Sequence, residues 1–89
     1  MFRVAWLKSA VDELASFWID AETPMRTMIT AASAEIDRRL AVDPQSAGES
    51  RDEGGRIDFV YPLSVTYQID LPSHSVTILH VRVYRRRQT

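Results

Sequence analysis

The spacing of apolar residues is helical in the first half of the chain and alternating in the second half. Residues 2–6 alternate first, which predicts a short, half-buried strand. Two helical stretches follow, with Ser9 and Thr23 as the expected N-caps and Asp43-Pro44 as the stop. Their apolar stripes are Val11, Leu14, Ala15, Trp18 and Ala21, then Met25, Met28, Ile29, Ala32, Ile36 and Leu40. The pattern therefore predicts a helical hairpin. The expected solvated face of its second, longer helix comprises Glu35, Asp37, Arg38 and Arg39.

Strict alternation begins at Ile57 and runs to Leu71, so that the odd-numbered residues are expected to form one apolar face. Pro62 cannot donate a hydrogen bond to a sheet, and we expect a turn or bulge there that divides the run into two strands. A single bent strand is the alternative. A last strand is expected at residues 76–83, where both parities are apolar, as is typical of a strand inside a sheet.

The order of the expected elements is β, α, α, β, β, β, with a polar loop at residues 43–55 that holds all three glycines. This order predicts an α+β fold in which two N-terminal helices pack on a mostly antiparallel, four-stranded sheet. The length of 89 residues suits a single domain that spans residues 1–89.

Charge is distributed unevenly behind a net value of −1. Residues 71–89 contain four arginines and no acid, whereas the rest of the chain holds seven basic and twelve acidic residues. An arginine cluster at a strand end attracts phosphates or acidic partner segments. The near-neutral total therefore conceals a polarised surface.

Composition also excludes several kinds of site. Cysteine is absent, so neither disulfides nor thiolate metal sites can form. No apolar run has the length of a signal peptide or a membrane span, and we expect a soluble, intracellular protein without a membrane partner. Asp12 and Glu13 are interpreted as acids that answer a helix dipole. Neither this pair nor Asp52-Glu53 has metal-ligand spacing, and no glycine motif follows a strand as in a phosphate-binding loop, so no metal and no cofactor are expected.

The last strand carries the candidate chemistry. If its odd residues face the helices, His80 shares the other face with Arg82 and Tyr84, and also with Val76 and Ile78. A histidine near an arginine and a tyrosine can perform acid–base chemistry on a phosphodiester, because its ordinary pKa lies near neutrality. The alternative is a structural or surface histidine.

Further arginines surround this strand and could bind phosphate oxygens in bidentate fashion. The alternative interpretation is a solvated tail that improves solubility or holds an acidic partner. The candidates are Arg51 and Arg56, which frame the start of the strand region, and Arg85, Arg86 and Arg87 at its end.

Four strings, in this order, resemble the RelE/ParE superfamily of bacterial toxins from type II toxin–antitoxin modules: FRVAWLKSAVDELASFW, RRLAVDPQSAG, SVTYQID and VTILHVRVYRR. The resemblance spans nearly the whole chain. It implies a cytoplasmic toxin that is neutralised in a hetero-oligomer with a cognate antitoxin encoded beside it. Members of this superfamily either cut mRNA on the ribosome without a metal or inhibit DNA gyrase. We expect a metal-independent mRNA endonuclease. The alternatives are a non-enzymatic gyrase inhibitor and a degenerate, non-toxic member that only binds its antitoxin.

The resemblance carries over to a small number of positions. His80, Arg82 and Tyr84 lie on the terminal strand, where the nuclease branch has catalytic or basic residues, and they are the expected catalytic residues. Arg56 stands where a basic residue often opens the second strand, whereas Ser64 occupies a place where many members have an arginine. The expected substrate-binding residues are Arg51, Arg56, Arg85 and Arg86.

Overall fold

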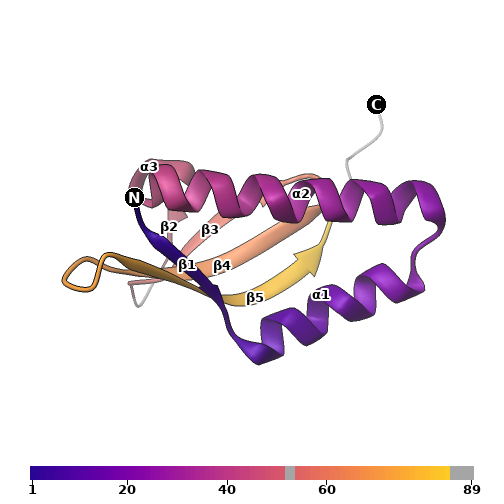
Figure 1. Cartoon of the computed structure of the whole chain (residues 1–89), viewed down its shortest axis with the longest axis horizontal. Coiled ribbons are helices and arrows are strands. Elements are labelled where there is room, and N and C mark those ends of the chain that lie inside the picture. Colours follow the sequence, from indigo (N-terminus) through magenta and orange to yellow (C-terminus); the bar gives the residue numbers. More distant parts are fainter. Residues whose placement is uncertain (52–53, 85–89) are drawn as a thin grey trace.

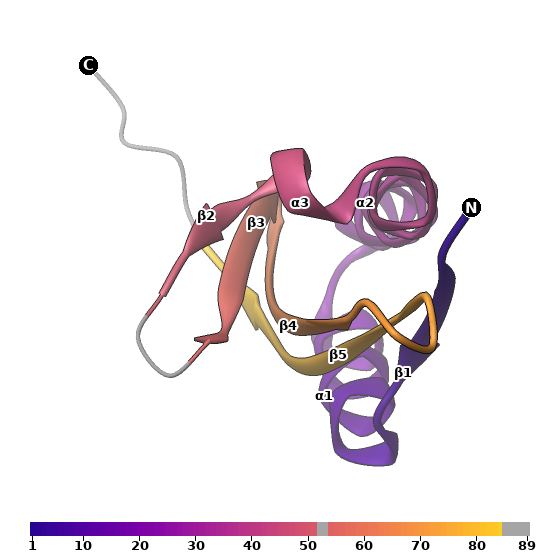
Figure 2. The ribbon, with the colours of Figure 1, turned by 90° about the vertical axis from the view of Figure 1, so that its left-hand side faces the viewer.

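Three helices and a five-stranded sheet make up the described part of the chain, residues 1–51 and 54–84 of a computed structural model. The elements are β1 (Arg3–Trp6), α1 (Lys8–Asp20), α2 (Thr23–Val42), α3 (Pro44–Ala47), β2 (Glu49–Ser50), β3 (Arg56–Val60), β4 (Leu63–Asp70) and β5 (Ser75–Val83). Figure 1 shows α2 lying across one face of the sheet, with α1 beside β5. In Figure 2, where α2 is seen end-on, the sheet curves around it. The expected α+β class is thus confirmed.

The sheet has the strand order β1-β5-β4-β3-β2. The neighbours are antiparallel except β1 and β5, which are parallel. The strand β5 lies between β1 and β4, as its apolar residues of both parities predicted. The predicted number of four strands is wrong by one, because β2 lies in the polar loop. Its two residues are too few to show a period in the sequence, as are the four residues of α3.

The predicted division of the alternating run at Pro62 is confirmed, since β3 ends at Val60 and β4 begins at Leu63. The predicted single apolar face is wrong. Val60 pairs with Leu63, so even-numbered residues of β3 share a face with odd-numbered residues of β4. Asp58 consequently faces α2 and is 3% exposed, whereas Phe59 lies on the opposite face.

A β-bulge in β5 overturns a second prediction of parity. Thr66 pairs with His80 and Tyr67 pairs with Ile78, which leaves Leu79 without a partner in the register. One extra residue moves all later side chains to the other face. Val76 and Ile78 are therefore buried on the side of α2, while His80 and Arg82 lie on the face turned away from it.

The core lies between α2 and the sheet. The buried stripe of α2 consists of Ile29, Ala32, Ile36 and Leu40, and the strands contribute Leu63, Val65, Tyr67, Val76, Ile78 and Val81. This confirms most of the predicted stripe of α2, although Met28 is exposed. In α1, by contrast, Ala10 alone is buried, and the expected stripe residues Val11 and Trp18 are exposed.

The helix ends differ from the predicted caps. The residues at the N-cap positions are Leu7 for α1 and Glu22 for α2, and neither side chain makes a cap hydrogen bond. The expected caps Ser9 and Thr23 lie inside the helices. The end of α2 at Val42 agrees with the predicted stop. Among the described residues, no helix is both long and apolar enough to cross a membrane.

Candidate functional site

The face of the sheet turned away from α2, here called the open face, carries two rows of side chains across β3, β4 and β5. One row runs from Ile57 through Thr66 to His80. The other row comprises Phe59, Ser64 and Arg82. Directly paired residues of neighbouring strands have adjacent side chains on one face. His80 therefore lies next to the hydroxyl side chain of Thr66, and Arg82 lies next to that of Ser64.

The exposure of these residues differs between the middle and the edges of the open face. The side chains of His80 and Arg82 are 58% and 59% exposed. Ser64, which lies between Phe59 and Arg82, is 8% exposed, and Phe59 is 47% exposed. The ring of Tyr84 meets that of Phe59 edge to face, with 5.5 Å between ring centroids. The open face therefore combines an imidazole, a guanidinium group and an aromatic pair in which Phe59 is exposed and Tyr84 is half-buried.

Glu13, on α1, reaches the edge of β5 and contacts this site. Its carboxylate forms an ion pair with Arg82 Nη1, and its Oε1 accepts a hydrogen bond of 3.0 Å from the backbone N–H of Val81. His80 Nδ1 lies 3.8 Å from the same Oε1. The pKa of Glu13 is lowered, chiefly by the Val81 N–H and then by Arg82, against the opposing effect of burial. The carboxylate is thus held in its charged form.

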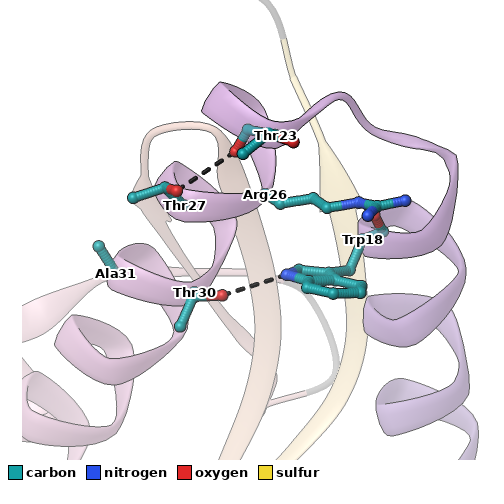
Figure 3. A pocket seen from close by; sticks show the side chains of 6 residues that line it. All are labelled: Trp18, Thr23, Arg26, Thr27, Thr30 and Ala31. Atoms are coloured by element: carbon teal, nitrogen blue, oxygen red, sulfur yellow. Dashed lines mark hydrogen bonds between the residues drawn. The ribbon is translucent and has the colours of Figure 1, made fainter.

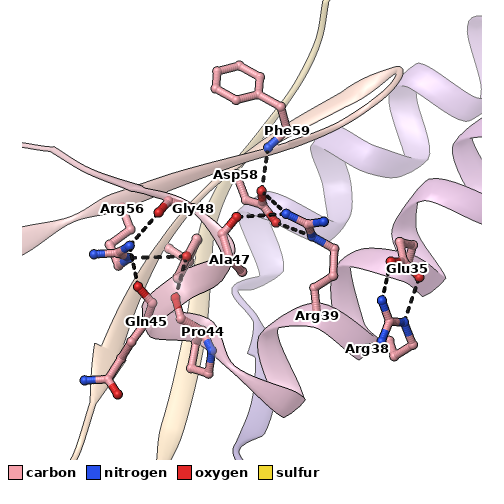
Figure 4. Close-up of polar contacts among 11 residues, drawn as sticks. Glu35, Arg38, Arg39, Pro44, Gln45, Ala47, Gly48, Arg56, Asp58 and Phe59 are labelled. Carbon is pink, nitrogen blue, oxygen red and sulfur yellow. Dashed lines mark hydrogen bonds and ion pairs between the residues drawn. The ribbon is translucent and has the colours of Figure 1, made fainter.

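The structure brings together His80 and Arg82 of the expected site and places Tyr84 beside Phe59, but it separates Arg56 from them. Arg56 pairs with Tyr67 and so lies on the side of α2. Its guanidinium donates to the carbonyl oxygens of Gln45 and Gly48 (Figure 4). It also donates to Ser50 Oγ and to Tyr67 Oη. It therefore joins the segment after α2 to the sheet instead of facing the open side.

Of the other expected arginines, the structure describes Arg51. Arg51 is exposed, and its backbone N–H donates to the carbonyl of Gly55. Arg85 and Arg86 lie outside the described residues, as does Arg87. Within residues 1–51 and 54–84, no group of three His, Asp or Glu side chains could hold a metal ion.

Asp58 and Arg39 form a second polar cluster that the sequence did not predict. Arg39 Nε and Nη2 each donate a hydrogen bond of 2.8 Å to the carboxylate of Asp58 (Figure 4). The same Nη2 also donates to the carbonyl of Ala47. Arg39 was expected on the solvated face of α2. It is only partly exposed, because the hairpin register turns Asp58 inward beneath it.

A shallow pocket of 510 Å³ lies between α1 and α2 (Figure 3). Trp18 Nε1 donates a hydrogen bond of 3.2 Å to Thr30 Oγ1, and the guanidinium of Arg26 lies 4.5 Å from the indole centroid. Both groups are thereby used in joining the helices. A neighbouring hollow of 410 Å³ is lined mainly by apolar side chains, among them Val11, Trp18 and Ile19.

Glu13 is the residue of this site that sequence reasoning missed. It was interpreted as an acid answering the helix dipole. Its partners Val81 and Arg82 lie 68 and 69 positions further along the chain. No local pattern could indicate this contact, because only the fold brings Glu13 of α1 to the edge of β5.

The fold of this chain is similar to the folds of several solved structures over nearly its whole length. The toxin–antitoxin complex RelBE2 from Mycobacterium tuberculosis contains a chain with 25% identity and a TM-score of 0.72, and the alignment covers 94% of this chain and 98% of that one. A chain of the chromosomal ParDE system of P. aeruginosa has 18% identity and a TM-score of 0.72, with 96% and 98% covered. The isolated E. coli RelE toxin has 13% identity and a TM-score of 0.64, with 99% and 89% covered. No protein-family model matches the sequence, and no curated protein sequence does.

Proposed function

We propose that the chain belongs to the RelE/ParE superfamily and is the toxin component of a type II toxin–antitoxin module. The observation that supports the proposal most is the agreement of the fold with RelE and ParE chains over almost the full length of both partners. A fold by itself does not specify a function, so the finer proposal depends on the open face.

For the activity, we propose metal-independent cleavage of mRNA, with translating ribosomes in the cytoplasm as the place of action. In this reaction the 2′-oxygen attacks the neighbouring phosphorus and the bond to the 5′-oxygen breaks, which leaves a cyclic phosphate and a 5′-hydroxyl. His80 accepts the proton of the 2′-hydroxyl, and water protonates the departing 5′-oxygen. Arg82 stabilises the negative charge that develops on the phosphate oxygens.

The aromatic pair contributes to binding in this proposal. Phe59 is a member of the row that contains Arg82, and the ring of Tyr84 meets that of Phe59. Proteins that recognise single-stranded RNA stack its bases on aromatic side chains. Phe59 is exposed enough for such stacking, and it would place the phosphate of the same nucleotide near Arg82.

The test is induction of the wild type, His80→Ala and Arg82→Ala in bacteria, followed by mapping of transcript 5′ ends. We expect new ends with 5′-hydroxyls for the wild type and a loss of about a hundredfold or more in each variant. Gln68→Ala is the matched control, since this residue is exposed on the same face but pairs with Thr77 and so belongs to neither row. Undiminished cleavage in both variants would refute the assigned roles. Harmless induction of the folded chain would favour a member that retains only antitoxin binding.

Inhibition of DNA gyrase is the second candidate, and one observation favours it. The ion pair with Glu13 offsets the charge of Arg82, which leaves little net positive charge among the described residues of the open face for an RNA backbone. This candidate predicts a DNA-damage response without new transcript ends. Full supercoiling activity of gyrase in the presence of excess protein would exclude it.

The antitoxin is proposed as the partner, on the exposed apolar side of α1. Val11, Trp18 and Ile19 are 46%, 40% and 63% exposed and line one hollow. An amphipathic segment of the antitoxin would bury these side chains. We expect the product of the neighbouring gene to co-purify with this chain and Ile19→Asp to weaken the complex. Ser16→Asp, on the exposed side of the same helix, is the control. Equal affinity of the two variants would place the antitoxin elsewhere.

A further inference from the structure

Three groups of β5 converge on one carboxylate that comes from another element. Glu13 Oε1 accepts from the N–H of Val81 at 3.0 Å and lies 3.8 Å from His80 Nδ1, while Oε2 pairs with Arg82 Nη1. A backbone N–H, an imidazole and a guanidinium are also the donors that bind phosphate oxygens. The arrangement is therefore an anion site that already contains an anion.

The position of Glu13 is fixed by the edge of the sheet. The pairing of β1 with β5 ends at Trp6 and Ile78, and Leu7 N makes the last backbone hydrogen bond, to Ile78 O. The N–H of Val81 lies beyond this point and has the Glu13 carboxylate as its acceptor. A buried or half-buried backbone donor needs a partner, so this bond opposes movement of the carboxylate away from β5.

The same carboxylate restricts Arg82. Arg82 Nη1 donates both to Glu13 Oε2 and to the carbonyl of Val81. A phosphate that binds the guanidinium from the open face must approach a carboxylate that remains attached to the strand. Like charges at such short range repel each other, and this repulsion lowers the affinity for the phosphate.

We propose that Glu13 is a built-in competitor of phosphate at Arg82, so that removal of its charge strengthens the binding of phosphodiesters to the open face. The inference rests on the proposed function in one respect, namely that RNA is the polyanion concerned. The competition itself concerns only the residues of this chain and can be measured without any catalytic activity.

The experiment compares the wild type with Glu13→Gln. Glutamine keeps an oxygen that can accept from the N–H of Val81, but it removes the negative charge beside Arg82. Asp12→Asn is the matched control, because it makes the same change of net charge one residue away, at a side chain that is 64% exposed and paired with Lys8. Binding of a labelled single-stranded oligoribonucleotide is followed by fluorescence anisotropy, and binding of inorganic phosphate is followed by NMR.

We expect Glu13→Gln to lower the dissociation constant for the oligonucleotide about fivefold at low salt, the size of one unit charge acting over a few ångströms in a wet site. The gain should shrink as the salt concentration rises and should vanish in Glu13→Gln/Arg82→Ala. Asp12→Asn should change the dissociation constant for the oligonucleotide by less than twofold. Inorganic phosphate should shift the Arg82 side-chain resonances in Glu13→Gln at lower concentration than in the wild type.

Three results would overturn the inference. These are an unchanged or weakened affinity in Glu13→Gln, an equal gain in Asp12→Asn, and the absence of phosphate binding in every variant. If Glu13→Gln fails to fold, a phosphate titration of the wild type tests the same inference. Saturating phosphate should then shift the carboxyl carbon resonance of Glu13 more than that of Asp12. If phosphate binding follows the prediction while no transcript is cut, the proposed activity is refuted and the competition stands.

Discussion

Replacement of Asp58 by alanine should destabilise the protein strongly, although Asp58 is not one of the candidate catalytic residues. Its carboxylate accepts three hydrogen bonds, two from Arg39 at 2.8 Å and one from the N–H of Phe59 at 2.9 Å. The side chain of Asp58 is 4% exposed and that of Arg39 is 34% exposed. Asp58→Ala leaves a half-buried guanidinium without its counter-ion.

The magnitude follows from this intermediate burial. Removal of one partner from a fully buried ion pair costs about 3–5 kcal/mol, whereas exposed pairs contribute about 0–1 kcal/mol. Since one partner is buried and the other is about one-third exposed, we expect a loss of about 2–3 kcal/mol. For a domain of this length, that corresponds to a fall in Tm of about 10–20 °C.

The assay is thermal and urea unfolding followed by circular dichroism. Arg38→Ala is the control, because its pair with Glu35 lies on the exposed side of the same helix and should contribute far less. Arg39→Met/Asp58→Leu should regain much of the stability, since an apolar pair of similar size needs no charge compensation. A loss below about 1 kcal/mol in Asp58→Ala, or one no larger than in Arg38→Ala, would refute the reasoning.

Three further predictions concern the same fold. Tyr67→Phe removes a hydroxyl that donates to the carbonyl of Pro44 at 2.8 Å, and its loss should reduce the unfolding free energy in urea by about 1–3 kcal/mol. Gly48→Ala places a Cβ against the carbonyl of Ile57 and 2.8 Å from the hydroxyl of Tyr67, and calorimetry should show a destabilisation of about 1–3 kcal/mol. The folded state lowers the pKa of Glu13, so its stabilising effect is complete above the ordinary value of 4.5 and is lost as the pH falls through the lowered pKa. The difference in stability between the wild type and Glu13→Gln should therefore shrink on acidification below pH 4.5, and a constant difference would contradict this assignment.

The elements with a long, regular period could be read from the sequence. The stripe of α2 was predicted because Ile29, Ile36 and Leu40 recur at helical spacing over several turns. The turn at Pro62 was predicted because proline lacks the N–H that a sheet needs. In α1, the same reasoning overestimated burial, since a periodic stripe does not show whether a partner covers it. Trp18 is 40% exposed for this reason.

The candidate site was predictable only as a set of residue types. His80 and Arg82 are two residues apart in the sequence, which predicts that their side chains share one face of the strand. This prediction is confirmed, because the bulge at Leu79 precedes both residues. The same bulge moved Val76 and Ile78 to the opposite face. Arg56 has the residue type of a phosphate-binding group, yet its strand register directs it to the carbonyls of Gln45 and Gly48.

The sequence alone determined the order of the elements other than α3 and β2, the helix-then-strand division of most of the chain and the concentration of chemistry-bearing residues in the last strand. These properties depend on local spacing and on the backbone limits of proline. Tertiary structure alone decided which face each strand residue occupies and which charges meet. A hairpin register and a single bulge set the faces, and the approach of α1 to the edge of β5 paired Glu13 with Arg82 across 69 positions. Electrostatic contacts depend on distance in space, so the charge of the open face could be known only once the chain was folded.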